Sequence, residues 1–321
     1  MGRPAPHGDR GSEPSLPALD GVRGLAIALV MAFHIGRVPA TAIGWSGVDL
    51  FFVLSGFLIT GILYRSRNVP ARARTFYARR ALRILPLYYV VIFAVFVVRP
   101  FLGWSNRLDD VSLAGEQFWY WTYLADWRIA LGHPRGFTFL THFWSLSIEE
   151  QFYLFWPLLV WNLSRRTALR AAIGITIGSF ILRLTLARFA ASSGMIYALL
   201  PCRIDALAVG AIAFLATAGQ ESRPKRDVVR RRIYAVGGVG AIVLTGLGLA
   251  RHSVSFADPA MVTFGLAAID WAYAAIVLFA ATERSAILEW GPLRMVGRYA
   301  YGLYVYPVSY THLTLPTNRE V

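Results

Sequence analysis

The sequence is poor in charge, lysine and cysteine. Only 16% of its 321 residues are charged and 56% are hydrophobic, whereas soluble globular domains carry about 25% charged residues. The lone cysteine, Cys202, excludes an internal disulfide and a cysteine-based metal site, and we expect no metal. No Gly-x-Ser-x-Gly motif occurs, which argues against the serine chemistry of soluble hydrolases. These absences favour a protein whose solvent is lipid.

Long apolar runs recur along the chain. A helix that crosses a bilayer needs about 20 mostly apolar residues. Residues 1–18 are polar and rich in proline and glycine, so we expect a disordered cytoplasmic tail there. The later runs predict an all-α, polytopic transmembrane helix bundle of about nine spans, at residues 22–38, 47–64, 82–99, 144–162, 169–188, 196–216, 233–250, 261–281 and from 294 onward.

The basic residues give the chain an orientation. The net charge is +14, and Lys225 is the only lysine among the cations. Arginines cluster in every second loop between the predicted spans, whereas the 101–143 loop balances its arginines with acids. Under the positive-inside rule, this alternation predicts a multi-pass protein of the cell inner membrane with a cytoplasmic N-terminus. Short clusters between apolar runs are typical of membrane loops, so we expect no nucleic-acid partner.

Two ionisable residues lie in the first predicted span. Arg23 and His34 are eleven residues apart, close to three helical turns, so they share one helix face. Ionisable side chains are costly inside a membrane and are functional candidates by default. A neutral imidazole at His34 can take a proton from an alcohol. The alternative is a buried, hydrogen-bonded structural histidine.

Two adjacent carboxylates, Glu149 and Glu150, lie about one turn into the fourth predicted span. A carboxylate beside His34 would fix the tautomer of the imidazole and raise its basicity. The alternative is a structural acid paired with Arg183 or Arg203.

Other polar residues lie in the second and sixth predicted spans. Asp49 either caps its helix or orients the histidine. Ser55 and its neighbour Gly56 are small enough for close helix packing. Arg203 and Asp205 are expected to neutralise each other.

Arg80 and Arg83 are three residues apart and share a helix face near the predicted cytoplasmic surface. Clustered guanidinium groups bind phosphates through forked, charge-assisted hydrogen bonds. Anionic lipid headgroups and a purely topological role are the alternatives for these two arginines.

Six motifs follow one another along the chain. They are Leu19–Ala26 with His34 in an Arg-x10-His spacing, Gly47–Ile59, Phe76–Pro86, Trp144–Tyr153, Arg203–Gly210 and Gly297–Tyr304. In this order the chain resembles the integral-membrane acyltransferase family 3, which includes O-antigen and exopolysaccharide O-acetyltransferases and macrolide acyltransferases.

The resemblance implies a membrane O-acyltransferase that moves an acyl group, commonly acetyl, from cytoplasmic acyl-CoA to a hydroxyl of a carbohydrate, glycolipid or macrolide. It implies no bound cofactor; acyl-CoA is the donor substrate. His34 would be the catalytic base and Arg23 its motif partner. Glu149 matches the family's acidic position better than its neighbour, and Arg80 and Arg83 match the donor-binding pair. The supporting positions would be Asp49, Ser55, Tyr77, Trp144, Ser145, Glu150, Arg203 and Asp205.

A transporter or flippase of lipid-linked sugar is the competing interpretation, since intramembrane ionisable residues also suit a proton-coupled carrier. Inverted repeats or a matched pair of broken helices would favour transport, and the sequence contains no such pair.

The last residues differ in character from the rest. Residues 307–321 are polar where the last predicted span should continue, and they resemble translated sequencing-adapter DNA. We therefore expect a membrane acyltransferase domain at 19–306 that is truncated at its C-terminus, followed by a foreign tail.

Overall fold

The computed structural model describes residues 16–35, 39–103, 115–132, 140–189, 191–218 and 222–305. Over these ranges the regular structure is helical and contains no strand. The predicted foreign tail lies outside the described residues, as does most of the predicted N-terminal tail, whose last two residues instead begin the first helix. The elements are α1 (Pro17–Ile35), η1 (Pro39–Ser46), α2 (Gly47–Arg65), α3 (Arg72–Phe93), η2 (Ala94–Val98), α4 (Arg99–Phe101), α6 (Gln117–Trp121), α7 (Ala125–Ala130), α8 (Phe143–Asn162), α9 (Arg165–Arg188), α10 (Ser193–Ala198), α11 (Leu200–Thr217), α12 (Arg223–Arg251), η3 (Met261–Gly265), α13 (Leu266–Thr282) and α14 (Gly291–Arg298).

Long apolar helices confirm a multi-pass membrane bundle, although not the count of nine spans. Within the described ranges, seven helices are long and apolar enough to cross a bilayer: 17–35, 41–65, 72–101, 165–188, 200–217, 224–251 and 261–282. The predicted span 144–162 is a helix, α8, but its run is interrupted by two carboxylates. The described part of the last predicted span consists of α14 and a short helical segment at 300–305.

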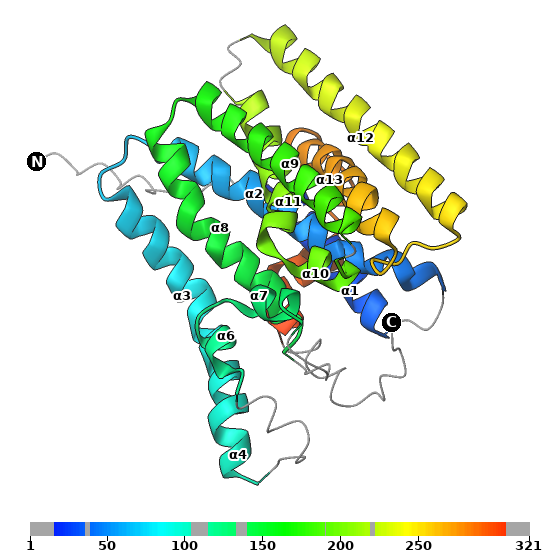
Figure 1. Cartoon of the computed structure of the whole chain (residues 1–321). Coiled ribbons are helices and arrows are strands. Elements are labelled where there is room, and N and C mark those ends of the chain that lie inside the picture. Colours follow the sequence, from blue (N-terminus) through cyan, green and yellow to red (C-terminus); the bar gives the residue numbers. More distant parts are fainter. Residues whose placement is uncertain are drawn as a thin grey trace, which may run out of the picture.

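Neighbouring helices run up and down, so that alternate turns meet on one side of the bundle (Figure 1). Arg67, after α2, donates from Nε to the carbonyl oxygen of Val160 at the end of α8, at 2.7 Å. Arg165, at the start of α9, donates to the carbonyl of Leu215 near the end of α11, at 2.7 Å. We call this side, where α2, α8 and α11 end, the arginine-rich face. Arginine side chains therefore close the bundle by binding the orphan carbonyls of helix ends.

Helix α2 forms the centre of the bundle. Buried residues make up 78% of the apolar window at 41–65, compared with 17% for the windows of α9 and α12, which are therefore lipid-facing helices. The closest packing of α2 is against α11. Gly56 of α2 lies directly on the backbone carbonyl of Leu207, and Gly210 of α11 lies on that of Val53. Small residues allow this backbone contact, which is how membrane helices associate without a hydrophobic driving force.

Replacing Gly210 with valine is expected to destabilise the bundle by about 1–3 kcal/mol, because the new methyl groups must push α2 and α11 apart. Gly178→Val is the matched control, since a side chain at Gly178 of α9 would meet no atom within 4 Å. Thermal unfolding in mild detergent measures both. Equal unfolding temperatures for the two variants would contradict the close packing.

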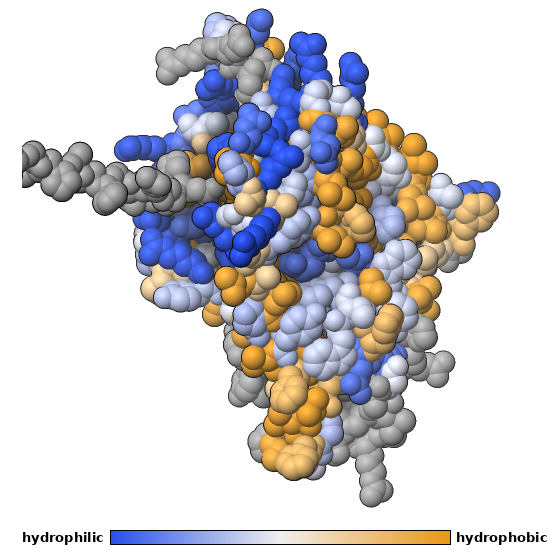
Figure 2. Space-filling model, turned by 90° about the vertical axis from the view of Figure 1, so that its left-hand side faces the viewer, coloured by the Kyte–Doolittle hydropathy of each residue, from blue (hydrophilic) through white to orange (hydrophobic). Residues whose placement is uncertain are grey.

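Helix α1, at the start of the described chain, packs against α14, which lies near its other end. Many large hydrophobic side chains are exposed on the outer surface. On the face in Figure 2, strongly hydrophilic side chains gather in the upper part, and hydrophobic ones cover the lower tip and much of the right-hand side. The exposed hydrophobic residues include Leu82, Val90, Phe93 and Phe101 on α3 and α4. Such a surface is compatible with a hydrocarbon environment.

Candidate active site

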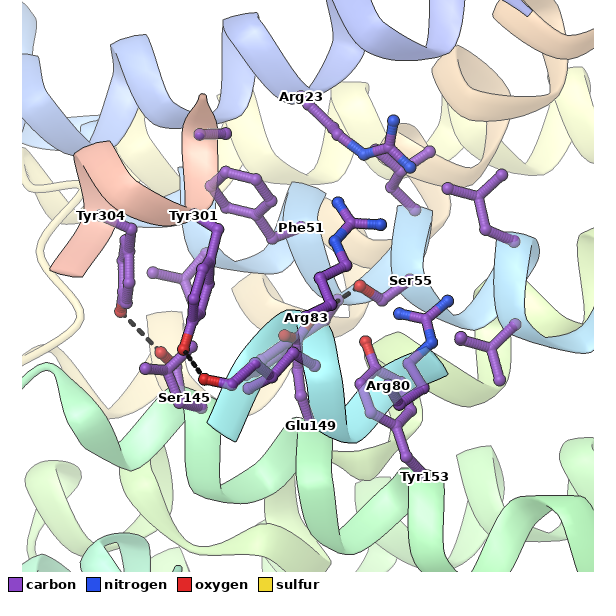
Figure 3. Close-up of a pocket in the computed structure, with 18 of the residues that line it drawn as sticks. Arg23, Phe51, Ser55, Arg80, Arg83, Ser145, Glu149, Tyr153, Tyr301 and Tyr304 are labelled. Carbon is purple, nitrogen blue, oxygen red and sulfur yellow. Dashed lines mark hydrogen bonds between the residues drawn. The ribbon is translucent and has the colours of Figure 1, made fainter. Parts of the chain in front are cut away.

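One open pocket gathers polar residues from helices that are far apart in the sequence (Figure 3). It encloses about 850 Å³ of empty space, open solvent included, and lies between α1, α2, α3, α8, α14 and the segment after α14. Its polar and aromatic lining comprises Arg23, Phe51, Phe52, Ser55, Arg80, Arg83, Ser145, Glu149, Tyr153, Tyr301 and Tyr304. Five of the six sequence motifs therefore contribute to one pocket.

Three guanidinium groups line this pocket. Arg80 and Arg83 project from one face of α3, and Arg23 reaches it from α1. Arg23 also binds Asp20, one turn earlier, with 2.5 Å between Nη1 and Oδ1. The guanidinium of Arg80 lies 5.1 Å from the ring centre of Tyr153. Three cations around a single hollow favour an anionic ligand, such as a phosphate.

Glu149 is the carboxylate of the pocket. Ser55 of α2 donates a hydrogen bond from its hydroxyl to Oε1 of Glu149 on α8, at 2.6 Å. Glu150 follows it on the helix, turned by about 100°, and is not among the residues that line the pocket. The pairing of Glu149 with Arg183 or Arg203 is wrong, since those two arginines bind aspartates. The carboxylate therefore faces the three guanidinium groups without a buried arginine of its own.

Two tyrosines after α14 close the pocket. The hydroxyl groups of Tyr304 and Ser145 are 2.6 Å apart. Tyr301 donates to the backbone carbonyl of Ile84 on α3, at 2.8 Å. Both tyrosines belong to the last sequence motif, yet the residue-by-residue reasoning named neither. The motif was the signal that could have identified them as residues that join α3 and α8.

His34 lies away from this pocket. It is not among the lining residues, and eleven residues of α1, or about 16 Å of helix rise, separate it from Arg23. Its Nδ1 is 2.8 Å from the carbonyl oxygen of Val30. Because a carbonyl can only accept, Nδ1 carries the proton and the lone pair is on Nε2. The Glu149 carboxylate accepts its hydrogen bond from Ser55, and His34 lies outside the pocket that Glu149 lines.

Two buried ion pairs join helix α11 to its neighbours α2 and α9. Asp49 binds Arg203 at 2.6 Å, and Asp205 binds Arg183 at 2.5 Å, and all four side chains are at most 1% exposed. The mutual neutralisation of Arg203 and Asp205 is therefore wrong. Residues two apart on a helix point to nearly opposite sides, so each found a partner on a different helix. The Asp49 carboxylate is held by Arg203, and Ser46, the N-cap residue of α2, makes no side-chain capping bond.

The remaining predicted residues serve the packing around the pocket. Tyr77 donates its hydroxyl hydrogen bond to the carbonyl of Leu154, at 3.0 Å, and so joins α3 to α8. Trp144 is buried, with its ring 5.0 Å from that of Tyr197.

In the part of the chain that the structure describes, no group of three or more His, Cys, Asp or Glu residues could hold a metal ion.

A sequence model of an acyltransferase domain matches residues 16–311. The chain belongs to the acyltransferase 3 family. It therefore contains an acyltransferase domain of the multi-pass membrane type, as the six motifs predicted.

Curated relatives agree with this assignment. The peptidoglycan O-acetyltransferase OatA of Listeria monocytogenes is 31% identical over 96% of this chain and 51% of its own length. YrhL of Bacillus subtilis, a candidate peptidoglycan O-acetyltransferase, is 29% identical over 91% of the chain and 48% of its own length. This chain thus spans about half the length of these relatives. No solved structure matches it.

Proposed function

We propose that this chain transfers an acetyl group from acetyl-CoA to a hydroxyl group of a carbohydrate acceptor. The observation that carries the proposal is the pocket that Arg23, Arg80 and Arg83 line together with the half-buried carboxylate of Glu149. The family assignment favours transfer chemistry over the transport of lipid-linked sugar. The names of the relatives support a cell-wall glycan as the acceptor, with glycolipids and macrolides as the other acceptors to test.

The separation of the two ends of the site supports acyl-CoA as the donor. The guanidinium groups are suited to phosphates, whereas the proposed base lies about 16 Å further along α1. A donor must therefore carry its phosphates at one end and its reactive acyl group at the end of a long arm. Acyl-CoA has this form, because a flexible arm joins its phosphates to its thioester. Glu149 lines the pocket beside the guanidinium groups, and we assign it the role of accepting hydrogen bonds from amide groups of the arm.

The chemical step needs one base. The acceptor hydroxyl attacks the thioester carbonyl while Nε2 of His34 takes its proton. The bond between carbon and sulfur then breaks, and the departing thiolate receives that proton, so that an ester and free CoA are formed. The Val30 carbonyl holds the proton on Nδ1 and so keeps Nε2 basic at the start of the step.

The charge distribution supports an orientation for the reaction. We place the arginine-rich face and the N-terminus on the cytoplasmic side of the inner membrane, following the positive-inside rule. The donor then enters from the cytoplasm, where its phosphates meet Arg80 and Arg83. His34 lies toward the opposite side, nearest to an external acceptor.

Membranes that contain the full chain test the proposal. They are supplied with acetyl-CoA labelled in the acetyl group, and label is followed into extracted glycan and into added small acceptors. Transfer that depends on the chain supports the proposal, with free labelled acetate as the negative control. If no acyl-CoA yields a labelled acceptor, the assignment of the donor fails.

Replacing Arg80 or Arg83 with glutamine is expected to raise the KM for acetyl-CoA about 10- to 100-fold with little change in kcat. Each replacement removes a charged hydrogen bond to the donor worth about 1.5–3 kcal/mol. Arg79→Gln is the matched control, because Arg79 is exposed on α3 and does not line the pocket. The donor role is wrong if the three variants share one KM.

A further inference from the structure

A second hollow lies between α9, α11 and α13. It encloses about 730 Å³ of empty space, open solvent included, and its walls are largely apolar, with Ile177, Phe180 and Ile212 among them. Ile177 is 54% exposed on the lipid-facing side of α9, so the groove opens sideways toward the hydrocarbon. Two carboxylates, Asp205 and Asp270, line the same groove. Acids in an apolar wall inside a membrane indicate a functional site.

Asp270 is the unmatched member of a buried charge cluster. Arg203 and Arg183 bind Asp49 and Asp205 respectively. Asp270 is 0% exposed, and among the described residues neither of its carboxylate oxygens has a hydrogen-bond partner. Three carboxylates against two guanidinium groups leave one negative charge when all five are ionised. A buried charge without a counterion is costly, so the cluster requires one further positive charge.

Among the described residues, the other helices do not supply that charge. The charged groups that act on Asp270 come from α2, α9 and α11 and are the four already paired. On the α12 side, α13 meets the glycines Gly237 and Gly240. The groove therefore remains the open route by which a cation can reach Asp270.

We propose that this groove is a bilayer-facing binding site for a single-chain amphiphile with a primary ammonium head. The chain lies along the apolar walls, and the ammonium donates hydrogen bonds to Asp270 and to Oδ1 of Asp205, which also lacks a partner among the described residues. The groove wall on α13 follows the π-helix η3, and such π-helical turns are frequent at functional sites.

Thermal unfolding of the purified full chain in neutral lipid nanodiscs tests the site. Dodecylamine is expected to raise the unfolding temperature by about 3 °C or more, whereas dodecanol leaves it unchanged. Asp270→Asn is expected to remove the response to the amine. Asp227→Asn is the matched control and keeps it, because this aspartate is half-exposed at the start of α12.

A second variant keeps the test decisive if Asp270→Asn does not fold. Ala267→Leu fills the groove beside the carboxylates without changing charge, and it is expected to abolish the shift caused by dodecylamine. Equal shifts with the amine and the alcohol would overturn the cationic site in favour of a neutral one. No shift with dodecylamine, or a shift that survives both variants, would overturn the site altogether.

Discussion

Replacing His34 with alanine is expected to lower kcat for acetyl transfer about 10²- to 10⁴-fold, the contribution typical of a general base. Binding of the donor should persist, because the guanidinium groups that we assign to its phosphates lie about 16 Å away along α1. Label transfer from acetyl-CoA measures the rate. The shift in unfolding temperature caused by CoA measures donor binding. A catalytic role predicts that only the first of these readouts changes.

The control for this variant is another histidine. His252→Asn replaces an exposed histidine at the end of α12 with a residue that tolerates its left-handed backbone, where φ is 50°. It should transfer label at the unmodified rate.

Glu149→Gln should lower transfer less than His34→Ala, because it weakens the hold on the donor arm and leaves the base intact. If His34→Ala keeps more than a tenth of the activity, His34 is not the base.

Replacing Arg203 with methionine is expected to destabilise the folded bundle by about 3–5 kcal/mol, the cost of breaking a buried ion pair. Asp49 loses its partner at 2.6 Å, and both side chains are fully buried. Arg203 also lies within 6 Å of the rings of Phe52, Trp144 and Tyr197, so its stem and planar head fill the space between helices. Thermal or denaturant unfolding in detergent measures the loss.

The double variant Asp49→Asn, Arg203→Met separates charge from packing. Removing both members of a buried pair is often nearly neutral, so this variant should recover most of the lost stability. A double variant as unstable as Arg203→Met alone would show that the arginine contributes through its packing rather than through the ion pair.

The sequence predicts which segments form helices more accurately than it predicts the residues at which those helices begin and end. Seven predicted spans correspond to helices of membrane-crossing length and hydropathy. The third was predicted to begin at residue 82, yet α3 begins at Arg72. Hydropathy detects the apolar part of a helix, whereas the backbone continues through Arg79 and Arg80, because arginine is a good helix former and its charged head can reach a polar surface.

The members of the site could be predicted, but not their partners. Arg23, Arg80, Arg83 and Glu149 meet in one pocket as the motifs indicated. The pairs formed by Arg203 and Asp205 could not be predicted, because they depend on which helix lies beside which face of α11. Asp270 was overlooked, although it is the only charged residue in the apolar run at 261–281. Its isolation there was itself a signal.

The contact between α1 and the segment that begins with α14 has a consequence for biosynthesis. The first helix supplies Arg23 to the pocket, and Tyr301 and Tyr304, near the other end of the described chain, supply the opposite wall. During translation, α1 leaves the ribosome roughly 270 residues before its neighbour α14. Until then, Arg23 lies on a helix whose pocket wall has not yet been made, although its partner Asp20 on the same helix is already present. The pocket lined by Arg23, Tyr301 and Tyr304 can therefore form only after α14 and the residues that follow it have been made.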